Sequence, residues 1–182
     1  MPNRAIRKFM ALDLEEKILN GASLGAFICV FFPWVGGEWL GGKMITHSGL
    51  GFFTSFIGLA VLIIHLYVIL ITLIPLTGRS AIVKRENRDL VRLLATLLAS
   101  ILTIAIWSVL TKFTVEFLRL QIYFGLYGTM AGSFIALLYS FLLHQESRRS
   151  VVKDLFHQKD NSYRSPEPPP SPEPEEHKLR AE

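Results

Sequence analysis

The chain has 182 residues, of which 51% are hydrophobic and 19% are charged, and its formal net charge is +4. Soluble domains are about 45–50% apolar, and they lack uncharged apolar runs long enough to cross a bilayer. Because such runs occupy most of this chain, no soluble domain with a basic face is left over, and we do not expect nucleic acid as a partner. The only cysteine, Cys29, excludes an intrachain disulfide and a CxxC redox centre.

The first predicted membrane span covers residues 18–35, after a basic N-terminal segment, 1–17, that we expect in the cytoplasm. Asp13 and Glu16 have the spacing of a capping box, in which the third helical residue bonds back to the helix start. This spacing predicts that a helix begins near Asp13 and continues into the span.

Residues 36–49 form the first predicted loop, which is rich in glycine. Trp34 lies just before it and Trp39 within it, and tryptophan favours the boundary between lipid and water. The sequence therefore predicts an aromatic anchor on a flexible turn. A recognition surface that uses Trp34, Glu38 and Trp39 is the alternative.

Residues 50–76 contain no Asp, Glu, Lys or Arg and form the second predicted span. About 20 such residues suffice for a bilayer, so we expect the apolar core of this helix to begin near Phe53. The third predicted span covers 90–111. Arg92 lies one turn inside it, and we expect its side chain to snorkel toward the interface.

The fourth predicted span, 120–143, carries the clearest helix-packing pattern. Small residues recur along one face of this helix, and a GxxxG pair lies in the first span. Such spacing lets the backbone of a neighbouring helix approach closely, either within one chain or between copies. The predicted helix-packing residues are Gly21, Gly25, Gly125, Gly128, Gly132, Ala136 and Ser140.

After the fourth span, residues 144–160 are predicted to form an amphipathic helix on the membrane surface. Residues 161–182 are rich in proline and glutamate, which predicts a disordered tail. Lysine and arginine gather in three segments, which contain Arg4, Arg7, Lys8 and Lys17; Arg79, Lys84, Arg85 and Arg88; and Arg148, Arg149, Lys153 and Lys159. The other two loops contain Lys43, Lys112 and Arg119. The positive-inside rule then predicts both termini in the cytoplasm.

His65 is the ionisable side chain deepest in a predicted span, which makes it a functional candidate. His47 and His144 fall at opposite ends of the helices, so bis-histidine haem is not expected, and no ligand cluster for a metal accompanies His65. An intramembrane hydrolase would pair His65 with a serine such as Ser133, which lacks a nucleophile signature. We predict a neutral histidine that is hydrogen-bonded to Ser, Thr or a carbonyl of another helix.

The sequence thus predicts an all-α membrane protein, an antiparallel bundle of four transmembrane helices in a cell membrane, favoured to be the bacterial cytoplasmic membrane. Two functions are consistent with it. The first is a non-enzymatic scaffold, adaptor or oligomer-forming subunit without a cofactor, whose partners are lipid and another copy or membrane protein. The second is a small permeation protein for a solute or proton that uses His65, Ser100 and Thr103.

Overall fold

The computed structural model describes residues 12–39, 42–76, 78, 83–84, 87–116 and 120–162. Most of the predicted N-terminal segment and of the predicted disordered tail lies outside these ranges. The chain divides into two units, Met1–Ser147 and Arg148–Glu182. The helices are α2 (Leu14–Cys29), α3 (Ser55–Leu76), α4 (Arg88–Glu116) and α5 (Phe124–Ser162), with the 3-10 helix η1 (Phe52–Thr54); the strands are β1 (Pro33–Trp39), β2 (Lys43–Ser48) and β3 (Leu120–Ile122).

The described residues are mostly helical, and three of the helices are long and apolar enough to cross a membrane. The crossing segments are Ser55–Pro75 of α3, Arg88–Glu116 of α4 and Phe124–Arg149 of α5. The remaining helix, α2, has 16 residues. A helix of that length rises about 24 Å, whereas the hydrocarbon core of a bilayer is about 30 Å thick.

The prediction of a helix through residue 35 was wrong, because α2 ends at Cys29 and strand β1 begins at Pro33. Proline cannot donate a backbone hydrogen bond, so it fits the first residue of a strand better than the last turn of a helix. The predicted all-α fold is therefore incomplete: a small sheet interrupts the helices.

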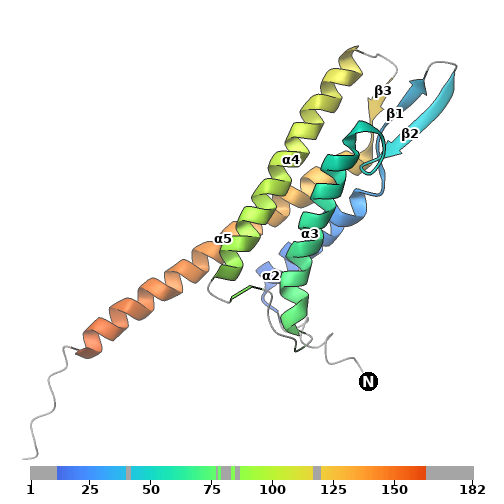
Figure 1. Ribbon diagram of the computed structural model, residues 1–182. Coiled ribbons are helices and arrows are strands. Elements are labelled where there is room, and N and C mark those ends of the chain that lie inside the picture. Colours follow the sequence, from blue (N-terminus) through green and yellow to red (C-terminus); the bar gives the residue numbers. More distant parts are fainter. Residues whose placement is uncertain are drawn as a thin grey trace, which may run out of the picture. The chain divides into compact units, whose positions relative to one another are not determined.

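The sheet is antiparallel, with the strand order β2-β1-β3, so the central strand pairs with a neighbour on both sides. Gly36 lies opposite Thr46 of β2 and opposite Gln121 of β3. A Cβ atom at Gly36 would lie 2.8 Å from the side chains of Thr46 and Tyr123, so a glycine is needed there for close packing rather than for a turn. Figure 1 shows the three strands gathered beside the first turns of α3 and α5; we call this the sheet end.

The predicted amphipathic helix over 144–160 has no start of its own in the structure, because α5 runs from Phe124 to Ser162 as one element, and its place on the membrane surface stays a prediction. No glycine or proline occurs between His144 and Ser162, so nothing in the local sequence ends the helix there.

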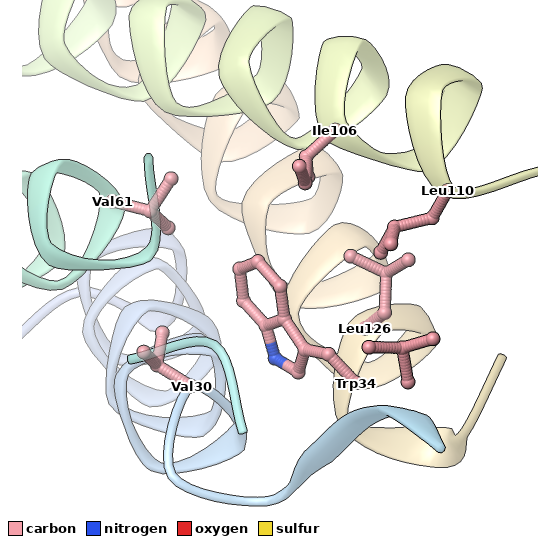
Figure 2. Close-up of a cluster of buried hydrophobic side chains, with 7 residues drawn as sticks. Val30, Trp34, Val61, Ile106, Leu110 and Leu126 are labelled. Atoms are coloured by element: carbon pink, nitrogen blue, oxygen red, sulfur yellow. The ribbon is translucent and has the colours of Figure 1, made fainter. Parts of the chain in front are cut away.

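A hydrophobic cluster fills the sheet end around Trp34, which is fully buried. In Figure 2 its ring lies among side chains of α3, α4 and α5. The indole Nε1 donates a hydrogen bond of 3.2 Å to the carbonyl of Cys29, at the end of α2. The prediction of Trp34 as a surface residue was thus wrong, since β1 turns the side chain inward, where a helix-terminal carbonyl accepts its N–H group.

Arg92, near the opposite end of the helices, is fully buried instead of snorkelling. Its guanidinium lies 3.0 Å from Glu16 Oε1 and donates to Thr72 Oγ1 at 2.5 Å. Arg88 also reaches Glu16, at 2.9 Å. Glu16 therefore serves the ion pair, and the predicted capping box is not formed, because Asp13 makes no side-chain cap hydrogen bond in the described structure. The ion pair joins α2, α3 and α4.

Replacing Glu16 by alanine should destabilise the protein by about 3–5 kcal/mol, because it removes the carboxylate nearest to the buried Arg92 charge and leaves the more distant Asp89, at 3.5 Å, as its carboxylate partner. Unfolding in mixed detergent micelles, followed by tryptophan fluorescence, measures the change. Glu15→Ala, one residue away, is the matched control and should change stability by less than about 0.5 kcal/mol. Equal losses in the two variants would contradict the assigned role of the ion pair.

Candidate functional site

His65 is fully buried on α3, and its Nε2 atom lies 2.9 Å from Ser133 Oγ on α5. Ser133 Oγ also lies 2.8 Å from the carbonyl oxygen of Thr129 and donates its hydrogen to it. A hydroxyl group has one hydrogen, so in the arrangement in which Ser133 donates to Thr129 it accepts the second bond, and His65 then carries its proton on Nε2. The predicted hydrogen bond to a serine of another helix agrees with this contact, and the neutral state of the ring stays a prediction.

Three hydroxyl residues of α4, Thr96, Ser100 and Thr103, lie on the side of that helix that is buried in the structure. Ser100 Oγ lies 2.9 Å from the carbonyl of Thr96 and 3.2 Å from the carbonyl of Ser133. Thr103 bonds only carbonyls of its own helix among the described contacts. The structure therefore brings Ser100 beside the His65–Ser133 pair, whereas Thr103 has no described hydrogen bond to that pair.

A fourth polar residue, Ser23 on α2, lies at the same depth. A Cβ atom at Gly132 would lie 2.9 Å from the carbonyl oxygen of Ala22 and 3.0 Å from the backbone N of Ala26, so this turn of α2 lies level with Gly132 and hence with Ser133. Ser23 belongs to that turn, is fully buried, and lies on a helix that packs against α3.

We call Ser23, His65, Ser100 and Ser133 the polar layer, with one member on each of the four long helices. Sequence reasoning missed Ser23. The signal was present in the helical spacing of Glu16, Leu19, Ser23, Ala26 and Val30, all of which are buried. The glycines Gly21 and Gly25 stand out more in the sequence, but they lie on a different face.

The small-residue face of α5 is occupied by other parts of the same chain. Added Cβ atoms at Gly125, Gly128 and Gly132 would meet the carbonyl of Pro33, the Sγ atom of Cys29 at 2.6 Å and the backbone of α2, respectively. Ala136 is buried with Leu19 and Val68 in a second hydrophobic cluster, and Ser140 is buried as well.

The other predicted positions lie away from the polar layer. Gly21 and Gly25 are exposed, and a Cβ atom at either would meet nothing within 4 Å. Glu38 is exposed on β1, whereas the side chain of Trp39 lies outside the described structure. Trp34 is buried, so it cannot belong to the predicted surface of Trp34, Glu38 and Trp39.

The chemistry of the polar layer is hydrogen bonding. In the described ranges no group of three or more His, Cys, Asp or Glu could hold a metal ion. A serine beside a histidine is also how a hydrolytic nucleophile is activated. Here, however, both side chains have no exposed surface, and the Ser133 hydroxyl is directed at a carbonyl of its own helix.

Comparison with protein-family models, with curated proteins and with solved structures finds no match to this chain.

The His65–Ser133 hydrogen bond should contribute a coupling free energy of about 0.6–1.7 kcal/mol, the range found between membrane helices. A double-mutant cycle with His65→Leu, Ser133→Ala and the double variant, measured by unfolding in micelles, tests this value. The same cycle with His65→Leu and Ser140→Ala is the control and should give no coupling, because no hydrogen bond joins those side chains among the described contacts. Additive losses in the first cycle would contradict the contact.

Proposed function

We propose that the protein is a non-enzymatic integral membrane subunit, a scaffold or adaptor that assembles with a second copy of itself through the exposed face of α2. In this proposal four helices cross the membrane, with both termini in the cytoplasm. The basic segments that flank the apolar runs support that orientation. The lipid bilayer is the first partner, and a bacterial cytoplasmic membrane is the favoured location.

The observation that carries this proposal is the difference between the two small-residue faces. The glycines of α5 are covered by α2 and β1 of the same chain. Gly21 and Gly25 of α2 have open space above them, and the side chains beside them, Leu24 and Ile28, are 49% and 46% exposed. A GxxxG face in a membrane gains dispersion contacts when a second backbone approaches it.

A second copy is the occupant that fits this face best. From Ile18 to Phe32 the chain has no Asp, Glu, Lys or Arg, so two such faces bring no like charges together. A glycine face is self-complementary, because each backbone fills the space above the other's glycines, and a two-fold axis closes the contact.

Gly25→Leu should lower the fraction of crosslinked dimer by about tenfold, because the leucine side chain blocks the approach of the second backbone. A tenfold change in the dimerisation constant corresponds to about 1.4 kcal/mol. The measurement is disulfide crosslinking of Leu24→Cys in a Cys29→Ala background, in native membranes. Ala131→Leu, at an exposed position of α5, is the matched control and should leave the dimer unchanged.

The variant Gly132→Leu distinguishes an effect on dimer formation from an effect on the folding of one chain. Its side chain would collide with α2 of the same chain, so we expect loss of stability rather than selective loss of the dimer. A dimer that survives Gly25→Leu would overturn the proposed interface, and crosslinking of Leu24→Cys to another membrane protein would replace the second copy as the partner.

The polar layer favours a second candidate function, permeation of a proton or small solute. The layer places four polar side chains at one depth; His65 bonds the Ser133 hydroxyl, and Ser100 bonds the Ser133 backbone carbonyl. Polar groups are costly in a membrane interior, and an ionisable one such as His65 is a functional candidate there.

Proton flux into liposomes that contain the purified protein tests this candidate. If it is correct, His65→Leu should reduce the flux to that of empty liposomes, whereas Thr103→Val should have a smaller effect because Thr103 has no described hydrogen bond to the pair. Equal flux in the wild type and His65→Leu would exclude the route through His65.

A further inference from the structure

Two polar atoms of the polar layer lack a hydrogen-bond partner among the described residues: His65 Nδ1 and Ser23 Oγ. Both side chains have no exposed surface, so bulk water does not satisfy them. A buried polar group without a hydrogen bond costs about 1–3 kcal/mol, and two such groups at one depth call for a specific explanation.

The state of Ser23 contrasts with that of five other buried hydroxyl groups, and among the described residues it is shared by Ser140. Thr96, Ser100, Thr103, Thr129 and Ser133 all bond a carbonyl three or four residues earlier in their own helix. That is the usual resting state of a serine or threonine inside a helix. Ser23 makes no such bond in the described structure, so its hydroxyl is available as both donor and acceptor.

The free atom of His65 is an acceptor. Since Ser133 fixes the proton on Nε2, the Nδ1 atom presents a lone pair. The chain therefore provides one acceptor on α3 and one hydroxyl on α2, on two helices that pack together, at the depth set by Gly132 and Ser133.

We infer that the polar layer binds one internal water molecule, which donates a hydrogen bond to His65 Nδ1 and accepts one from Ser23. Water is the ligand that fits, because it is small enough for a packed bundle and can donate and accept at once. Buried waters typically make about three hydrogen bonds to groups that are otherwise unsatisfied. Ser100 Oγ, which uses its single hydrogen on a carbonyl, has lone pairs left for a third bond.

The bound water extends the hydrogen bonds of the layer into one chain from α2 through α3 to α5. The chain runs from the Ser23 hydroxyl to the water, to His65 Nδ1, and from Nε2–H to Ser133 and the carbonyl of Thr129. A histidine suits this position, because a neutral imidazole accepts a hydrogen bond at one ring nitrogen and donates one at the other. The water site is independent of dimer formation through α2 and of any proton flux.

Water-edited solid-state NMR of the full-length, isotope-labelled protein in lipid bilayers tests the site. Water is the probe itself. We expect the His65 ring to receive magnetisation from water well before the methyl groups of Val61 and Val68, which are buried on the same helix. The ring nitrogen shifts should identify a neutral imidazole protonated on Nε2 with a hydrogen-bonded Nδ1.

Ser23→Val should abolish the fast transfer to His65, because the valine removes the hydroxyl and fills its space. Ser140→Val is the matched control: Ser140 is the other buried hydroxyl without a described partner, seven residues or about 10 Å along α5 from Ser133. Transfer to His65 no faster than to Val61 in the wild type would overturn the inference, whether or not the Ser23 variant folds. Loss of transfer in Ser140→Val but not in Ser23→Val would overturn it as well.

Discussion

The internal pairing of polar groups is the constraint on which the rest of the structure depends. A guanidinium or an imidazole inside a bundle of apolar helices has to find its partners on other helices, because lipid offers none. Arg92 does so with Glu16 and Thr72, and His65 does so with Ser133. These contacts tie all four long helices together at two depths. Eight residues, or about 12 Å of helix, separate Arg92 from Ser100 on α4.

Close backbone packing is the second constraint. Membrane helices gain little hydrophobic free energy from one another, so dispersion at short range has to hold them together. The glycines of α5 let α2 approach so closely that a side chain at Gly128 or Gly132 would collide with α2. That approach brings Ser23 to the depth of Ser133. The polar layer and the small-residue face are thus two results of one helix packing.

The sheet gives the bundle its third support. Strand β1 connects α2 to a hairpin and also pairs with β3, which precedes α5 directly. The strand β1 pairs with β2 and β3, and it also places Trp34 in the hydrophobic cluster at the sheet end. The ends of α2, α4 and α5 are in this way held by backbone pairing as well as by side-chain contacts.

The sequence by itself determined the apolar helices and the small-residue face of α5, because each follows from local composition or spacing. It could not reveal partners distant in the chain, which only the tertiary structure decided. Glu16 reads locally as a capping residue, and Gly36 reads as part of a turn, yet one binds Arg92 and the other lies in the central strand. Ser23 shows the same limit: nothing in the local sequence marks its hydroxyl, and only the packing of α2 against α5 brings it to the depth of Ser133.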